Sequence, residues 1–226
     1  MWAVLPVKAF TQAKQRLADF LTPLQRQELA QAMFEDVLQA LRDSGTIEHI
    51  LVVTNDAQVA DIGAAYGAQI LQESSLTAPQ GLNAAVAQGF GALAVLGVKH
   101  ALILHADLPL LHSDDVRALC LQHKTGTISV VADRHQQGSN ALLCDVPAPI
   151  AFCYGANSFT QHQAQAQKAD VDYLRQALPR LQLDIDTADD VAYLLQHLPP
   201  HCASKTAALL RRLPLSSLFQ TIGIPV

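Results

Sequence analysis

The chain has 226 residues, half of them hydrophobic, and a formal net charge of −5 at pH 7. This length suits one domain with a well-buried core, and the acidic balance argues against a protein that binds nucleic acid or membranes by charge. The four cysteines form no CxxC pair, the first residues read as a strand rather than a signal peptide, and no apolar run could span a bilayer, so we expect a cytoplasmic protein.

The first half of the chain alternates strand-like and helix-like segments. The apolar run at 2–7 is typical of a strand buried on both faces of a sheet, and Thr22 with Pro23 begins a helix that Gly45 ends. Further strands are expected at 50–53, 69–71, 101–104 and 127–131, and further helices at 56–66, from Gly81 to about 96, and from 113 onwards.

The alternation changes after Asp133, where the segment 141–144 and two prolines favour an antiparallel excursion over another crossover. We therefore expect an α/β fold with a mostly parallel central sheet. The remaining expected elements are a helix at 158–168 that Ser158 caps, a last strand at 181–185, and a helix that Thr187 caps. The domain is expected to span 1–198, and 199–226 to form a C-terminal appendage that could pack on a partner subunit.

The loop after the first strand carries three cations, Lys8, Lys14 and Arg16. In a doubly wound sheet this loop faces the ligand crevice, so the cations could hold a triphosphate. The loop has neither the GxGxxG nor the GxxxxGK[ST] pattern, which argues against a dinucleotide fold or a P-loop kinase. The alternative is an ordinary solvated basic loop.

Asp107 follows a short apolar strand and precedes Pro109. A carboxylate at such a strand end is well placed to bind Mg²⁺ that bridges nucleotide phosphates. The alternative role, capping the helix that starts near Ser113, requires a shorter separation than six residues. We expect the neighbouring His105 to make a polar hydrogen bond at the strand end.

Asp184 and Asp186 alternate along the expected last strand, which would place both carboxylates on one face. Two acids on one face repel unless a cation lies between them. A second metal contact is one reading. In the other, Asp186 merely precedes a capped helix and Asp184 is solvated.

Two small polar loops flank the irregular segment that follows Asp133. Ser139 and Asn140 lie in the first, and Gly155 and Ser158 in the second. Exposed backbone N–H groups, hydroxyls and a helix start could together form an anion cradle. Loops are commonly rich in such residues, so the pattern alone does not assign the function.

These motifs together resemble the CofC/FbiD family, the guanylyltransferases of deazaflavin coenzyme F-420 biosynthesis. That family is similar to the molybdenum-cofactor guanylyltransferases and to sugar-nucleotide pyrophosphorylases. The resemblance covers residues 1–198 and leaves the tail outside it. It rests on PVK and AKQRL in the first loop, GLN at 81–83, ADLPLL at 106–111, DRHQQGSNALL at 133–143, FCYGANSF at 152–159 and LDIDTADD at 183–190.

The resemblance implies a Rossmann-like nucleotide-diphospho-sugar transferase fold and a reaction of GTP with a phosphorylated three-carbon acid, with Mg²⁺ as cofactor and pyrophosphate as product. The family's acids are 2-phospho-L-lactate, phosphoenolpyruvate and 3-phospho-D-glycerate. Some members carry Asp-x-Asp where this chain has His105-Ala106-Asp107. By motif, Lys8, Lys14 and Arg16 would hold the triphosphate, Gly81, Leu82 and Asn83 would contact guanosine, Asp107 and Asp186 would bind metal, and Ser139 or Asn140 with Gly155 and Ser158 would bind the acid.

Such a reaction needs no protein nucleophile, because cations and Mg²⁺ must mainly neutralise two reacting anions. The chain accordingly offers no credible Ser-His-Asp or Cys-His set. A molybdopterin or sugar-phosphate nucleotidyltransferase would share the first loop and ADLP but should lack YGANSF. A non-catalytic regulator would bind GTP without turnover. We expect no nucleic-acid or membrane partner, and a homodimer is left open.

Overall fold

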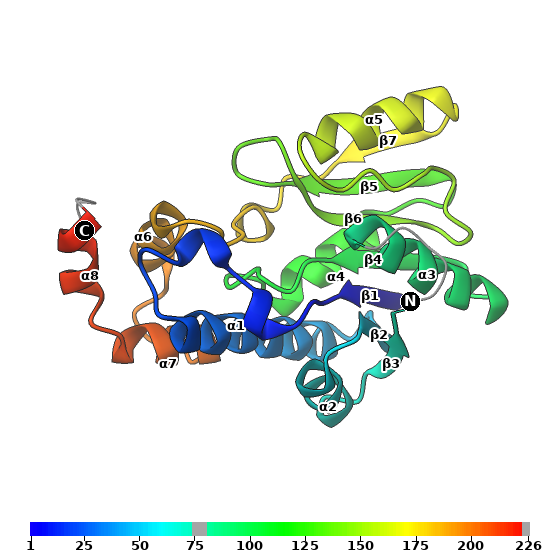
Figure 1. The fold of residues 1–226 in the computed structure, drawn as a ribbon. Coiled ribbons are helices and arrows are strands. Elements are labelled where there is room, and N and C mark those ends of the chain that lie inside the picture. The colour runs from blue at the N-terminus through cyan, green and yellow to red at the C-terminus, as the bar shows by residue number, and fades with distance from the viewer. Residues whose placement is uncertain (74–80, 223–226) are drawn as a thin grey trace.

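The computed structural model describes residues 1–73 and 81–222. At its centre lies a seven-stranded sheet, flanked by helices (Figure 1). The strands are β1 (Trp2–Pro6), β2 (His49–Thr54), β3 (Gln69–Gln72), β4 (His100–Leu104), β5 (Thr127–Ala132), β6 (Ser139–Asp145) and β7 (Asp172–Arg175). The α-helices are α1 (Pro23–Asp43), α2 (Ala57–Ala65), α3 (Leu82–Val95), α4 (Ser113–Gln122), α5 (Ser158–Lys168), α6 (Ala188–His197), α7 (Lys205–Arg212) and α8 (Leu215–Ile222).

The strand order is β3-β2-β1-β4-β6-β5-β7. Strands β1 to β4 run parallel, β6 runs antiparallel to both of its neighbours, and β7 is parallel to β5. The expected mostly parallel α/β sheet with an antiparallel excursion is therefore confirmed. Within the described ranges, no helix is long and apolar enough to cross a membrane.

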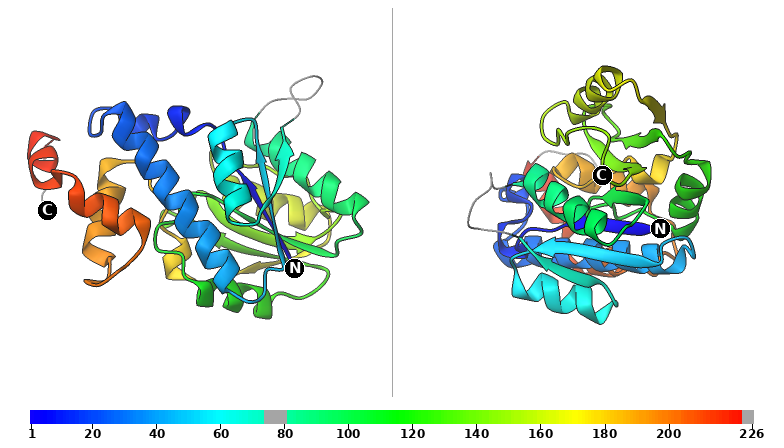
Figure 2. Two further views of the ribbon diagram at one scale, coloured as in Figure 1. Left: turned by 90° about the horizontal axis from the view of Figure 1, so that it is seen from below. Right: turned by 90° about the vertical axis from the view of Figure 1, so that its right-hand side faces the viewer.

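The sheet is covered on both faces, because successive side chains of a strand point to opposite sides. Ala3 and Leu5 of β1 pack with side chains of α1, α2 and α4, whereas Val4 packs with side chains of α3. All three are fully buried, as the continuous apolar run at 2–7 predicts. Figure 2 shows the resulting layers from two further directions.

The C-terminal helices cover a third apolar cluster at one end of the molecule. Helix α7 packs along α1, and the backbone N–H groups of Lys205 and Thr206 donate to the Asp36 carboxylate. The Phe219 ring of α8 is fully buried and lies 4.7 Å from the Phe20 ring, between centroids. The described part of the tail thus packs on its own chain (Figure 1).

The strand expected at 181–185 is wrong. Leu181, Leu183 and Ile185 are buried in alternation, but they fill two apolar clusters instead of pairing with a strand. The place beside β5 belongs to β7, whose sequence DYLR carries too few apolar residues to stand out. Residues Pro179–Leu181 form a short 3-10 helix, η3.

The helix starts follow the capping residues in the sequence. Thr22 and Thr187 each form a capping box with the third helical residue, as the sequence indicates. Helix α5 is the exception, because its N-cap is Asn157, with a φ of 56°, and Ser158 is already helical. The capping role expected of Ser158 is therefore wrong, and its hydroxyl is free for another partner.

Candidate active site

A cleft of about 270 Å³ opens at the carboxyl ends of β1 and β4. Such an edge is where ligands bind in open α/β sheets. The first-loop cations, the start of α3 and the segment after β4 all reach this cleft, so three sequence-predicted clusters meet there. The polar residues that line the cleft are Lys8, Lys14, His105 and Asp107. Leu82, from the motif at 81–83, lines it as well.

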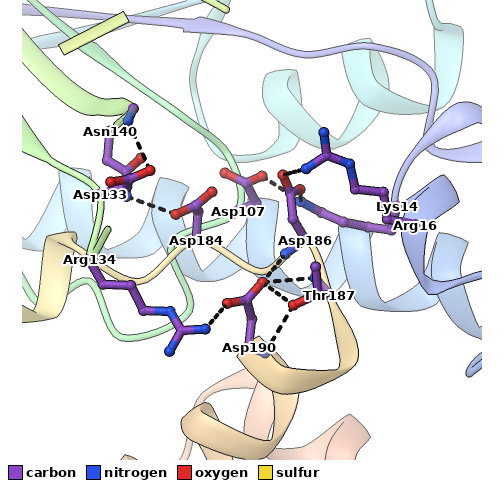
Figure 3. A network of polar contacts seen from close by, with 11 residues as sticks. Lys14, Arg16, Asp107, Asp133, Arg134, Asn140, Asp184, Asp186, Thr187 and Asp190 are labelled. Atoms are coloured by element: carbon purple, nitrogen blue, oxygen red, sulfur yellow. Dashed lines mark hydrogen bonds and ion pairs between the residues drawn. The ribbon is translucent and has the colours of Figure 1, made fainter. Parts of the chain in front are cut away.

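Lys14 joins Asp107 and Asp186 in the polar network at this cleft (Figure 3). Its Nζ lies 2.5 Å from Oδ2 of Asp107 and 3.2 Å from Oδ1 of Asp186. The Arg16 guanidinium lies 3.5 Å from the other Asp186 oxygen and is largely exposed, whereas the Lys14 side chain is only 7% exposed. Asp107 and Asp186, which the sequence predicts to bind metal, thus lie close together. Lys14, predicted to bind phosphate, connects them.

The backbone of Lys14 has a φ of 55° and ψ of 39°, in the left-handed region. A non-glycine residue there is strained by roughly 1–3 kcal/mol, and such residues cluster at functional sites. Lys14 directly precedes the 3-10 helix Gln15–Leu17, η2, whose Leu17 is fully buried. The buried turn therefore holds this backbone and directs the ammonium group toward the carboxylates.

The charges of this network shift two pKa values. Burial opposes the charged form of Lys14, but Asp107 and Asp186 outweigh it and raise the pKa of the ammonium group. Burial would raise the pKa of Asp107, but the charge of Lys14, the neighbouring His105 and the hydrogen bond from Lys14 together outweigh it and lower that pKa. Both groups are therefore ionised at neutral pH.

Asp184 lies on the other side of Asp107 (Figure 3), and its Oδ1 accepts from Nδ2 of Asn140 at 3.2 Å. Burial, reinforced by the negative charge of Asp107, raises the pKa of Asp184 to about 6. The three carboxylates thus form a row in which one end group gains its proton near pH 6. Burial is the main cause of this shift, and the neighbouring negative charges add to it, since a buried charge beside like charges is costly.

Asp186 lies in a loop, and hydrogen bonds to Asp190 fix the position of this loop. One Asp190 oxygen accepts from the backbone N–H groups of Asp186 and Thr187, and the other lies 2.6 Å from the Arg134 guanidinium. These contacts fix the approach of Asp186 without a neighbouring strand. Nothing in the sequence marked Arg134 or Asp190 for this role.

The two small polar loops predicted to bind the acid, here called the acid-loop cluster, are mostly buried. The Ser139 N–H donates to Oγ of Ser158 at 2.9 Å, and Ser139, Asn140 and Ser158 are all buried. Gly155 is exposed, has a φ of 128°, and has open space where a Cβ would lie. Of the four residues predicted to bind the acid, Gly155 is the exposed one.

His162 joins this cluster and was not foreseen from the sequence. Its Nε2 accepts from the Cys153 N–H at 2.9 Å, so Nδ1 carries the proton that is donated to Ser139 Oγ at 3.0 Å. Burial lowers its pKa to about 4, so the ring is neutral at pH 7. A histidine seven places from the Gly155 loop on a helix gave no distinctive signal.

Asn83 connects the start of α3 to the segment before Gly155. Its Oδ1 accepts from the Tyr154 N–H at 2.6 Å, and its Nδ2 donates to the Tyr154 carbonyl at 3.0 Å. The Tyr154 ring in turn lies 5.5 Å from the ring of His105. The motif predicted to contact guanosine thus connects the acid-loop cluster to the cleft. Its first residue, Gly81, precedes α3 with a φ of 124°.

The donor set suits a divalent cation that prefers oxygen. Oδ1 of Asp107 is buried and has no hydrogen-bond partner among the described residues, and carboxylates from Asp184 and Asp186 flank it. Oxygen ligands are those that Mg²⁺ takes. The hydrogen bond expected at His105 is absent at Nε2, which is also buried and unpartnered in the described chain.

Comparison with known proteins gives one consistent result. The family described as "Guanylyl transferase CofC like" matches residues 1–221, so the match includes most of the tail. A phosphoenolpyruvate guanylyltransferase from Conexibacter woesei is 36% identical over 192 residues, 84% of this chain and 85% of the relative. A 3-phospho-D-glycerate guanylyltransferase from Colwellia psychrerythraea is 32% identical over 191 residues, 84% of this chain and 89% of that relative.

The fold is also similar to that of solved nucleotidyltransferases. A putative nucleotide-diphospho-sugar transferase from Desulfovibrio desulfuricans superposes with a TM-score of 0.73 at 17% identity, covering 97% of this chain and 96% of that one. The nucleotide-diphospho-sugar transferase fold expected from the sequence is confirmed.

Proposed function

The chain belongs to the CofC-like guanylyl transferases and is a nucleotidyltransferase, and from this premise we propose that it transfers GMP from GTP to a phosphorylated three-carbon acid. Pyrophosphate leaves, and the product is a guanosine diphosphate linked to the acid. The observation that carries this proposal is the ammonium group of Lys14 between Asp107 and Asp186 at the cleft beside the carboxyl ends of β1 and β4.

The triphosphate would lie over the first loop. Lys8 and Lys14 line the cleft, and the exposed Arg16 reaches the Asp186 carboxylate. Three cations at one loop supply the charge that a tri-anion needs, and each charged contact contributes about 1.5–3 kcal/mol. Leu82 lines the cleft from the side of α3, which supports guanosine binding near Gly81, Leu82 and Asn83.

Asp107 and Asp186 would hold Mg²⁺, with Asp184 as a further oxygen donor once it has lost its proton. When bound, the ion would neutralise phosphate charge and polarise the phosphoryl oxygens. Lys14 now neutralises the two carboxylates. Its ammonium group would also help to neutralise the phosphates at the cleft that it lines.

The acceptor's phosphate must attack the α-phosphorus of GTP although both are anionic. Lys14, Arg16 and Lys8 would lower this repulsion and stabilise the leaving pyrophosphate, while the rigid loop would hold the reactants in line. No residue of this chain needs to form a covalent intermediate. Positioning and charge neutralisation carry the reaction.

The acid would bind beside the exposed Gly155, whose backbone leaves space for a substrate. Ser139, Asn140 and Ser158 would support that loop and the row of carboxylates, because their side chains already contact protein atoms. The acids in the names of the relatives, phosphoenolpyruvate and 3-phospho-D-glycerate, share a phosphate and a carboxylate on three carbons. We place the product in deazaflavin coenzyme F-420 biosynthesis, as the motif resemblance implies.

Pyrophosphate release tests this proposal. The full chain with Mg²⁺ is incubated with GTP, CTP or UTP and with phosphoenolpyruvate, 3-phospho-D-glycerate, 2-phospho-L-lactate or a sugar phosphate. Release that requires both GTP and a phosphorylated three-carbon acid supports the proposal. Release with a sugar phosphate instead, or GTP binding without release, contradicts it.

A further inference from the structure

A second group of potential ligands lies at the opposite end of β4 from the cleft. It consists of His100 at the first residue of β4, His123 just after α4, and Asp145 at the last residue of β6. Asp107 follows the far end of β4, and five strand residues span about 16 Å, so the two groups are separate. None of the motifs that indicate guanylyl transfer includes these three residues.

The ligand atoms of the three side chains lie within 4.8 Å of one another. His100 Nε2 is 3.0 Å from Thr125 Oγ1, a hydrogen bond that a bound metal would replace, and 3.2 Å from Asp145 Oδ1. Two ligands at about 2.0–2.2 Å from one zinc ion, with an angle of roughly 100° between them, would be separated by that distance. Since the other separations do not exceed 4.8 Å, a combined movement of at most about 1.6 Å would bring the third ligand to the same separation.

Neighbouring atoms already orient two of these side chains. The Gly126 N–H donates to Oδ2 of Asp145 at 2.8 Å, which leaves Oδ1 toward His100. Nδ1 of His123 is 3.1 Å from Oγ of the fully buried Ser129. Metal-binding histidines and carboxylates have such outer partners, which fix the ring and the carboxylate.

The other ring nitrogen of His123, Nε2, is buried and has no hydrogen-bond partner among the described residues. A buried polar nitrogen without a partner costs about 1–3 kcal/mol. A metal ion between His123, His100 and Asp145 would satisfy this nitrogen.

We propose that His100, His123 and Asp145 bind one divalent transition-metal ion, with zinc as the best match. Two imidazole nitrogens and one carboxylate are a donor set for zinc or similar ions, not for Mg²⁺, which prefers oxygen ligands. The ion joins the start of β4, the end of α4 and the end of β6. It would therefore connect the end of helix α4 to the sheet at a distance from the reacting groups.

The test uses the tag-free full chain, freed of metal with a chelator and titrated with Zn²⁺ by calorimetry in excess Mg²⁺. The excess Mg²⁺ occupies oxygen-donor sites, so the titration reports nitrogen-containing ones. We expect one Zn²⁺ per chain and a higher melting temperature with Zn²⁺ than with Mg²⁺ alone, because a ligand of the native state stabilises it. Tetrahedral Co²⁺ in place of zinc would add visible absorption bands.

His123→Gln and Asp145→Asn should each weaken Zn²⁺ binding by at least about 10–100-fold. His201→Gln, at an exposed histidine outside the group, is the matched control and should bind like the unaltered chain. Asp145→Asn keeps an acceptor for the Gly126 N–H, so it serves if His123→Gln does not fold. The absence of stoichiometric Zn²⁺ binding to the unaltered chain overturns the site, as does binding that both variants retain in full.

Discussion

Lys14 is the residue on which the site's charge balance depends. Its ammonium group contacts Asp107 and Asp186, and its backbone is held in the left-handed region by the turn that follows. Removing this charge would leave two carboxylates facing each other across the cleft. The residue therefore links the stability of the metal-free protein to the chemistry proposed for the complex.

Lys14→Met is expected to raise the GTP concentration needed for half-maximal rate by at least about tenfold, since one charged phosphate contact is worth about 1.5–3 kcal/mol. It should also lower the melting temperature in chelator, and Mg²⁺ should restore part of that loss by occupying the space between Asp107 and Asp186. Steady-state kinetics and thermal melts with and without Mg²⁺ measure both effects. Arg16→Ala, at a largely exposed side chain, is the control and should change the melting temperature little. An unchanged response to GTP in Lys14→Met would remove this lysine from the nucleotide site.

Asp184 gives a pH-dependent prediction. Its native pKa of about 6 exceeds the ordinary value of 3.8, so the native state holds a proton that the unfolded state has lost between those pH values. Ionising Asp184 thus costs stability, and this cost is complete above pH 6. Asp184→Asn removes the cost while keeping an oxygen acceptor for Asn140.

In chelator, Asp184→Asn should therefore melt several degrees higher than the unaltered chain at pH 7.5, and this gain should shrink toward pH 5. Each kcal/mol corresponds to about 2–4 °C for a chain of this size. Asp61→Asn, at an exposed acid of α2, controls for general charge effects. The same difference in melting temperature at both pH values would contradict the proposed crowding of carboxylates.

Residue types alone predicted the polar groups at the cleft, because cations and acids directly after strands must gather at one edge of a parallel sheet. The roles of Arg134, Asp190 and His162 could not be predicted this way. Each acts through a contact with a residue far along the chain, for instance 56 positions between Arg134 and Asp190. Such pairings depend on the complete fold.

At the scale of elements, two buried hydrogen bonds fasten helix α5 to β6, one from the Ser139 N–H to Ser158 Oγ and one from His162 Nδ1 to Ser139 Oγ. Ser158→Ala leaves that N–H unpaired in the interior, which costs about 1–3 kcal/mol. The melting temperature should fall by about 2–12 °C. Thr160→Ala, at an exposed position of the same helix, should have little effect.

The same variant separates a supporting role of Ser158 from direct substrate contact. If the hydroxyl supports the loop, the loss of stability accompanies any change in the response to the acid. A tenfold higher acid requirement at an unchanged melting temperature would contradict the supporting role and favour a direct contact with the substrate.

The elements themselves were predictable wherever a local signal marks them. Capping residues and apolar periodicity gave α1, α2, α4 and α6 and the buried strands of the parallel half. The segment 181–185 was wrongly predicted to be a strand. Alternating burial also arises when a chain without a strand partner runs between two apolar clusters. Strand β7 has few apolar residues to mark it in the sequence. It forms because its backbone pairs with the edge of β5.

At the scale of the whole molecule, the tail helices complete the apolar cluster around η2, α1 and α6. Phe219→Ala removes a fully buried ring that contacts Phe20 and should cost about 3–5 kcal/mol. Thermal or urea melts of this variant, with Gln220→Ala as an exposed neighbour in α8, measure the loss. Equal stability of both variants would show that the tail contributes nothing to the domain and would favour a boundary near residue 198.

Label transfer from GTP tests the central claim most directly. GTP labelled at the α-phosphorus is incubated with Mg²⁺, the full chain and the phosphorylated acid that supports pyrophosphate release, and a parallel sample carries the label at the γ-phosphorus. The account predicts that the α label appears in a product that also contains the acid, while the γ label appears only in pyrophosphate, and that Asp107→Asn loses most of both. Transfer of the γ label to the acid, or release of orthophosphate without an acid-linked product, would contradict guanylyl transfer by this chain.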